Sequence, residues 1–144
     1  MMIPRRDRPD RRGAAMLEAA VVYPVTMLLL IGTVVLGIAV FRYEQLQALA
    51  REGARYASVH GPTYASDTPN ASVASSTDIE NNVLTPMAHG LSGLTCSVTW
   101  NPNPPTTGAP STVTVQLSYS WVPEAYFSKQ AVSLTASSTM PVTY

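Results

Sequence analysis

The most prominent feature of the hydrophobic pattern is an apolar run near the N-terminus. Between Ala14 and Phe41 the only ionisable side chain besides Tyr23 is Glu18. The run from Ala19 to Phe41 exceeds the ~20 apolar residues that a helix needs to cross a bilayer core. The pattern therefore predicts a transmembrane helix.

Helical periodicity continues after Phe41 and stops at Gly61-Pro62. Apolar residues recur every three or four positions, with polar residues between them; the apolar positions are Tyr43, Leu46, Ala50, Ala54 and Ala57. One helix from about Ala14 to about Val59 would be ~69 Å long at ~1.5 Å per residue, roughly twice the hydrocarbon thickness. The outer half of this helix must therefore pack on another element.

Two positions in this helix carry specific expectations. Pro24 removes the amide that would bond the carbonyl of Ala20, so it predicts a helix kink near the N-terminal end of the span. Gly53 costs ~1 kcal/mol relative to alanine in a helix. We predict that Gly53 and Ala54 are helix-packing positions, where Gly53 marks either a close approach by another backbone or a weak spot in a marginal helix.

A short helix is predicted after a loop. Residues 60–76 are rich in Ser, Thr, Pro and Gly and lack periodicity, which is typical of a linker. Thr77 or Asp78 can cap a helix that is short or bent at Pro86 and closes at His89-Gly90. Its apolar positions are Ile79, Val83, Leu84 and Met87.

Three later segments alternate apolar and polar residues with a period of two, which predicts half-buried strands. The apolar faces are Leu94, Cys96, Val98 and Trp100; then Val113, Val115, Leu117, Tyr119 and Trp121; then Val132, Leu134, Ala136 and Met140. The expected connections are residues 101–110 and 123–130. The predicted fold class is α+β: a long N-terminal transmembrane helix whose amphipathic extension packs on a small antiparallel sheet of about three strands.

This pattern divides the chain into four regions: a basic leader (1–13), the transmembrane helix and its continuation (14–59), a linker (60–76) and a small helix-plus-sheet module (77–144).

Charge gives this arrangement an orientation. Although the net charge is zero, five arginines lie in the first thirteen residues, and Lys129 is the only basic residue after Arg55. The positive-inside rule places the N-terminus in the cytoplasm and the C-terminal module outside it. A cleavable secretory signal has an apolar region of only ~7–15 residues, so the run favours an anchor despite the small residues at Gly37-Ile38-Ala39. Arg11-Arg12 fits a twin-arginine signal, but an ordinary anchor explains it equally.

Catalytic chemistry is not indicated. His60 and His89 are isolated in the sequence, and no phosphate-binding loop or metal-ligand spacing occurs. Cys96 is the only cysteine, which excludes an internal disulfide, and its place on an apolar strand face predicts a buried, inert thiol. We therefore expect no enzyme, cofactor, metal, small-molecule substrate or nucleic-acid partner.

Glu18 is the one candidate functional group, because an ionisable residue within a spanning segment is costly. The simpler interpretation is that it lies at the headgroup level and pairs with Arg11 or Arg12. The spacing of Glu18 favours a second interpretation. Cleavage after Gly13 would make Ala14 the first residue and Glu18 the fifth, directly ahead of an apolar helix. That arrangement looks like a prepilin leader.

A family resemblance rests on three groups of residues. They are Arg12-Gly13-Ala14-Ala15-Met16-Leu17-Glu18, Pro24 within the span, and Ala50-Arg51-Glu52-Gly53-Ala54-Arg55-Tyr56-Ala57. Together they are similar to the TadE-like family of pilus-assembly proteins. Two positions differ from related sequences: Ala19 replaces a frequent aromatic residue, and Val35-Leu36-Gly37 replaces an acidic-aromatic-glycine element.

The resemblance implies a pilin-like fold and the role of a minor pseudopilin in a tight-adherence secretion system. It implies a single-pass protein of the bacterial inner membrane with a periplasmic or extracellular module, processed by a prepilin peptidase between Gly13 and Ala14. Its partners would be other pilin or pseudopilin subunits and pilus-assembly proteins, with Glu18 accepting the Ala14 amine of a neighbouring subunit. The alternative is a membrane-tethered envelope binding module with no pilus role, in which Gly13 and Glu18 are coincidental.

Overall fold

The computed structural model describes residues 11–103, 105, 111–123 and 130–143. The arginine-rich leader up to Asp10 and most of both predicted strand connections lie outside these residues. The chain forms two compact units, one up to Gly37 and one from Ile38 onward, and each is described by itself.

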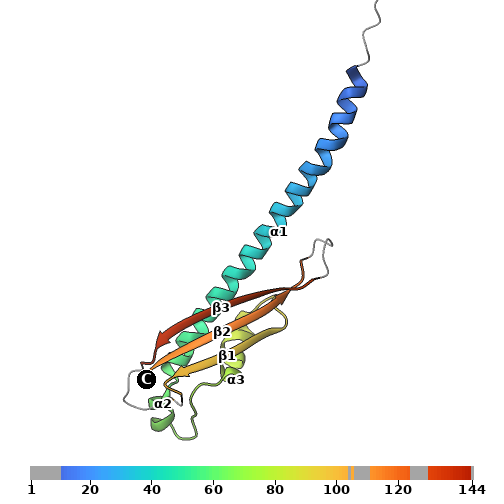
Figure 1. Ribbon diagram of the computed structural model, residues 1–144. Coiled ribbons are helices and arrows are strands. Elements are labelled where there is room, and N and C mark those ends of the chain that lie inside the picture. Colours follow the sequence, from blue (N-terminus) through green and yellow to red (C-terminus); the bar gives the residue numbers. More distant parts are fainter. Residues whose placement is uncertain (1–10, 104, 106–110, 124–129, 144) are drawn as a thin grey trace, which may run out of the picture. The chain divides into compact units, whose positions relative to one another are not determined.

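Helix α1, Arg11–Val59, has 49 residues and supplies all of the described first unit (Figure 1). It is long and apolar enough to cross a membrane, and its most apolar stretch is not buried by the rest of the protein. The hydroxyls of Thr26 and Thr33 donate to the carbonyls of Val22 and Leu29 at 2.9 Å, so these polar groups are satisfied inside the helix. Pro24 lies within the helix, and the kink there stays a prediction.

The second unit contains an antiparallel sheet in the order β1-β2-β3, formed by β1 (Leu94–Asn101), β2 (Thr112–Trp121) and β3 (Val132–Pro141). Leu117 on the central strand lies opposite Cys96 on one side and Ala136 on the other. Burial on β2 alternates as predicted, with the apolar residues inside. These observations confirm the predicted α+β fold with a three-stranded antiparallel sheet.

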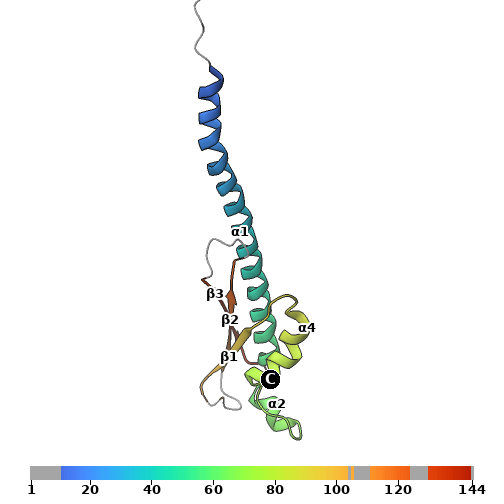
Figure 2. The same cartoon turned by 90° about the vertical axis from the view of Figure 1, so that its right-hand side faces the viewer.

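Helices cover one face of the sheet, so the unit has two layers. Figure 2 shows the sheet edge-on, with α1 and the later helical segment on the same side of it. The core between the layers is fully apolar at its centre, and its largest completely buried side chains are Leu46, Ile79, Val113, Val115 and Leu117. The opposite face of β2 is polar, which is the arrangement expected of an antiparallel sheet that has one face in water.

The segment predicted as a loop, residues 60–76, contains a short helix, α2 (Pro62–Asp67). Pro62 stands at the start of α2, where its fixed φ suits a helix and its missing amide costs nothing. The loop prediction treated Gly61-Pro62 only as a stop signal, although the same pair also begins a new helical turn.

The next helical segment consists of α3 (Ser76–Ile79), a π-helix η1 (Glu80–Leu84) and α4 (Thr85–Met87). Its N-cap is Ser75, so the predicted cap at Thr77 or Asp78 was wrong. Ser75 and Asp78 form a reciprocal capping box, in which each side chain accepts the other residue's backbone amide. In the wide turn of η1, the amide and the hydroxyl of Thr85 both donate hydrogen bonds to the carbonyl of Glu80. The next residue, Pro86, has no amide that could donate.

Asp78 makes this cap dependent on pH. Hydrogen bonds from the Ser75 hydroxyl and amide hold the pKa of Asp78 below its ordinary value of 3.8. Such a carboxylate stabilises the fold above its unfolded pKa, and this contribution is lost as the pH falls through the lower folded value. We expect Asp78→Asn to reduce stability by ~1 kcal/mol at pH 7, and denaturant titrations should show the difference from the wild type disappearing as the pH falls through the lowered pKa of Asp78. A difference that stays the same from pH 7 into the acid range would contradict this cap.

Gly53 lies where α1 meets both α3 and the sheet. A Cβ atom added there would stand 3.2 Å from the Ile79 side chain and 3.3 Å from that of Val115. The close approach is therefore made by side chains of α3 and β2, not by another backbone. Ala54 beside it is completely buried.

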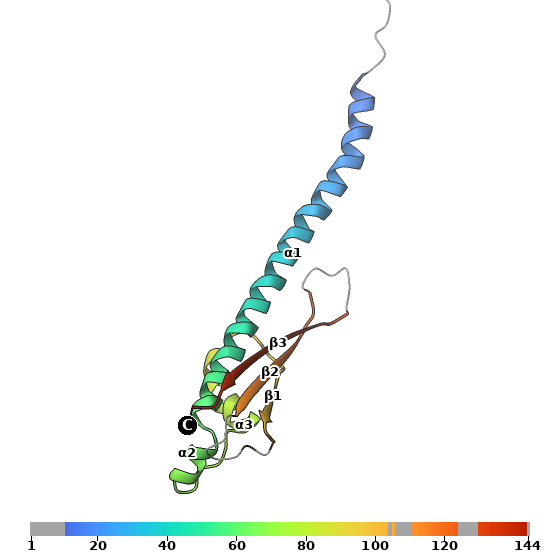
Figure 3. The same cartoon turned by 60° about the vertical axis from the view of Figure 1, so that its left-hand side comes forward.

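The described end of the chain returns to the end of α1 (Figure 3). The Val142 amide donates to the Ser111 carbonyl at 2.9 Å, and the Thr143 amide donates to the Ser58 carbonyl at 3.0 Å. The last residues therefore fasten the sheet to the C-terminal end of the long helix.

Candidate functional site

The predicted processing and contact residues lie in the first turns of α1. Gly13, Ala14 and Glu18 are all exposed. The Glu18 side chain has no hydrogen bond or ion pair with any side chain that the structure describes. The side chains of Arg11 and Arg12 are outside the description, so their pairing with Glu18 stays a prediction. Glu18 is therefore exposed on the N-terminal part of α1.

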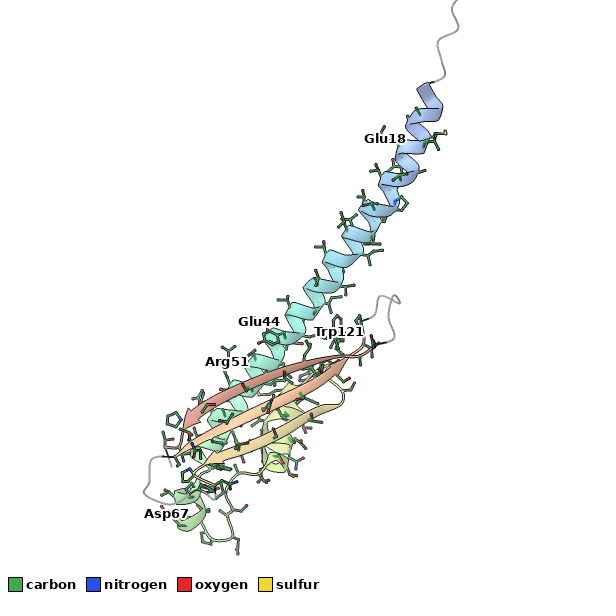
Figure 4. All side chains as sticks on the ribbon, viewed as in Figure 1. Glu18, Glu44, Arg51, Asp67 and Trp121 are labelled. Atoms are coloured by element: carbon green, nitrogen blue, oxygen red, sulfur yellow. The ribbon has the colours of Figure 1, made fainter. Side chains whose placement is uncertain are left out.

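A second candidate surface follows the outer half of α1 on the side opposite the core. We call it the outer stripe; it consists of Glu44, Ala48, Arg51, Glu52 and Arg55, all exposed. Figure 4 shows Glu44 and Arg51, seven residues apart, projecting from the same side of the helix. The four charged side chains of the outer stripe form no ion pair with the residues that the structure describes. Acidic and basic groups on one helix face suit contact with another charged helix.

An open groove borders the outer stripe, between α1 and the α4 segment. It comprises two depressions of about 320 and 530 Å³, and Glu52 and Met87 line both. Val59 and Met87 are exposed apolar side chains in this region, at 43% and 54% of their surface. The groove is shallow and mixed in character, which suits contact with a polypeptide better than enclosure of a small molecule.

Arg42 joins α1 to the sheet at the point where the apolar run ends. Its guanidinium donates to the Gly90 carbonyl at 3.0 Å and to the Tyr119 hydroxyl at 3.4 Å. The guanidinium carbon also lies 5.8 Å from the centroid of the Tyr119 ring, within range of a cation–π interaction. The sequence showed Arg42 only as a polar position on the helix, because its partners are 48 and 77 residues away.

His60, predicted to be isolated, lies in an aromatic cluster at the other end of α1. Its ring stacks on Tyr56 at 4.0 Å and meets the edge of Tyr64 at 4.6 Å. Burial, followed by the charge of Asp78, raises the pKa of Tyr56. The spacing of four residues was a signal for the contact of Tyr56 with His60 at the end of α1, since such residues are neighbours on a helix. Tyr64 belongs to α2, so its contact with His60 depends on the turn between the two helices. The cluster closes the C-terminal end of the helix.

Cys96 is half-buried on β1, and burial raises the pKa of its thiol to about 11. The thiol is therefore protonated at neutral pH and reacts slowly, since the thiolate is the nucleophile.

We expect maleimide to label native Cys96 at least about tenfold more slowly than the denatured chain at pH 7. A matched control is the Cys96→Ser, Ser97→Cys variant, whose thiol would lie at the next, exposed position of the same strand. Equal labelling rates of the two native proteins, followed by mass spectrometry, would contradict the expectation.

Among the residues that the structure describes, no three His, Cys, Asp or Glu side chains gather where they could hold a metal ion. The geometry provides exposed helix surfaces and a shallow groove as its functional features.

Comparison with known proteins finds a family match within α1. Residues 13–55 match the family model described as "TadE-like protein". No curated protein and no solved structure matches the chain. The matched residues fall entirely within α1, from the uncovered Gly13 through Glu18 to the last member of the outer stripe.

Proposed function

Because the chain is TadE-like over residues 13–55, we propose that it acts as a membrane-anchored pseudopilin in the assembly of a tight-adherence pilus or secretion system. The TadE-like family suggests involvement in such systems. The observation that carries the proposal is that the family match covers α1 and leaves out the whole sheet. What this chain shares with the family model is therefore its long helix.

In this role the protein works through contacts between subunits and performs no catalysis. The apolar part of α1 anchors it in the bacterial inner membrane, with the N-terminus in the cytoplasm and the sheet outside. The exposed apolar side chains of α1 would be covered by lipid or by the spans of neighbouring subunits. The outer stripe and its groove would meet charged helices of other subunits above the membrane.

Glu18 supplies the specific contact within the membrane. A charge among apolar helices is stable only when it is paired. After a prepilin peptidase cuts between Gly13 and Ala14, the new Ala14 amine of one subunit is a suitable partner for Glu18 of the next. Gly13 and Ala14 lie in the first turns of α1, so the peptidase would have to unwind this end of the helix.

Processing is tested by the mass of the chain extracted from its native membrane. We expect an N-terminus at Ala14, and an intact Met1 start would refute the leader. Co-purification from a mild detergent extract tests assembly: pilus-assembly proteins should accompany the tagged chain. An intact N-terminus together with an absence of such partners would favour the alternative, a membrane-tethered envelope binding module.

A further inference from the structure

Exposed apolar side chains of the second unit gather at one end of it. Among the described residues from Ile38 onward, seven large apolar side chains are exposed, and two of them, Val59 and Met87, belong to the groove. The other five come from two places in the sequence: Val40, Phe41 and Tyr43 on α1, and Val122 and Val132 at the adjoining ends of β2 and β3. Val132 pairs with Trp121, which immediately precedes Val122.

Contacts between α1 and the sheet fix the level of this end along the helix. Thr143 bonds Ser58, and its neighbour Val142 bonds Ser111, so Ser111 lies near the level of Ser58. At the other end Arg42 bonds Tyr119. The helix rises ~24 Å from Arg42 to Ser58, and β2 spans ~26 Å from Ser111 to Tyr119. The agreement means that β2 runs alongside α1, almost antiparallel to it.

The end of β2 therefore reaches beyond Arg42. Trp121 and Val122 follow Tyr119 by two and three residues, which places them ~7 to 10 Å past the level of Arg42. In that direction α1 carries residues 38–41, the last four of the apolar run, which belong to the same compact unit. Figure 4 shows Trp121 at this end of the sheet. If residues 38–41 are at membrane depth, the ends of β2 and β3 are there too.

We propose that this end of the second unit, which we call the lipid-facing end, sits in the outer headgroup region of the membrane. Val122, Val132 and Phe41 enter the lipid, the Arg42 guanidinium stays bonded to Gly90 and Tyr119, and the Tyr43 hydroxyl, which accepts from Gln47 at 2.9 Å, faces the water. Aromatic side chains are characteristic of this depth. The opposite end of the unit carries exposed polar residues such as Ser66, Asp67 and Asn70. The inference rests on the proposed membrane anchoring, and it assigns the sheet a contact with lipid that anchoring alone does not require.

The two tryptophans test it from within the chain. Trp100 pairs with Val113, eight residues from Trp121, so the two rings lie ~26 Å apart along β2. The full-length variants Trp100→Phe and Trp121→Phe each keep one tryptophan and are reconstituted into phosphatidylcholine–phosphatidylglycerol vesicles containing lipids with a nitroxide near the headgroup. We expect quenching of Trp121 to be at least about twofold stronger than quenching of Trp100, because the two rings differ in level by ~26 Å along the strand and a nitroxide quenches only nearby rings. In the Trp100→Phe variant, the additional substitution Val122→Asp should weaken the quenching of Trp121, since a charge in the interfacial region is unfavourable.

A second pair of variants avoids changes in the core. In a Cys96→Ser background, a fluorophore on Val122→Cys should be quenched by the same lipids and one on Ser66→Cys should not, because both positions are exposed but lie at opposite ends. Equal quenching at the two positions, or at the two tryptophans, would overturn the proposal. So would disulfide cross-linking of Val122→Cys chains without quenching, which would show a second copy covering this end.

Resistance to alkaline carbonate extraction distinguishes the membrane anchoring from the lipid contact of the sheet. A chain that resists extraction but lacks selective quenching is anchored, and only the lipid-facing end is refuted. A chain that carbonate removes from the membrane would refute the anchoring itself.

Discussion

Glu18→Ala is expected to leave the chain in the membrane and to lower its recovery with pilus-assembly proteins about tenfold or more, which corresponds to ~1.4 kcal/mol or more of lost contact energy. The reason lies in the exposed position of Glu18 on a helix otherwise surrounded by apolar side chains. Removing the carboxylate makes insertion easier, because a charge in the membrane is costly. In the proposed contact it also removes the partner for the Ala14 amine of a neighbouring subunit.

Quantitative co-purification from detergent extract, normalised to the amount of chain in the membrane, measures this effect. Glu18→Gln separates charge from shape, and it should be as defective as Glu18→Ala if the contact is an ion pair. Leu17→Ala is the matched control, since Leu17 is the adjacent residue and is also exposed. Normal co-purification of Glu18→Ala would show that Glu18 merely sits among the headgroups.

The second large effect is expected at Gly53. Gly53→Ile should destabilise the second unit by about 3 kcal/mol, because the new side chain would collide with Ile79 and Val115 at the centre of the core. Gly53→Ala should stay within about 1 kcal/mol of the wild type. Its gain in helix propensity of ~1 kcal/mol offsets a displacement of a few tenths of an ångström by its neighbours.

Denaturant titration in mild detergent, followed by tryptophan fluorescence, measures these differences, because both tryptophans lie in the second unit. Ala48→Ile is the matched control: it adds the same kind of side chain to the same helix, but on the exposed outer stripe. We expect it to change stability by less than about 0.5 kcal/mol. Equal losses for Gly53→Ile and Ala48→Ile would mean that Gly53 is only a weak spot in the helix.

Regular elements of the fold were predictable because each repeats a pattern over many residues. Alternation on β2 from Val113 to Trp121 specified both the strand and its buried face, and the structure confirms them. The long helix was equally clear. Shorter elements were not, since α2 has six residues and its helical state depends on Pro62 beginning a turn instead of ending one. The cap at Ser75 was missed in favour of Thr77 or Asp78, although Ser75 and Asp78 have the spacing of a capping box.

Contacts between distant parts of the chain could not be predicted from local patterns. The bonds from Arg42 to Gly90 and Tyr119 depend on how the sheet packs on α1. The same is true of Gly53, where the sequence indicated either a close approach or a weak spot, and the structure identifies Ile79 and Val115 as the approaching groups. For the functional surfaces, the sequence located Glu18 and the charged positions of α1, but only the packing shows that the outer stripe lies on the uncovered side.

The bonds that tie Thr143 to Ser58 and the packing of Val115 on Gly53 also constrain biosynthesis. Gly53 and Val115 are separated by 62 positions in the sequence (115 − 53). The second half of α1 therefore leaves the ribosome well before the strands that cover it, and contacts of such long sequence separation form late. Until β2 and β3 have been synthesised, Leu46, Ala50 and Ala57 have no sheet to pack on. A chaperone or another apolar surface would have to shield this half of the helix during that interval.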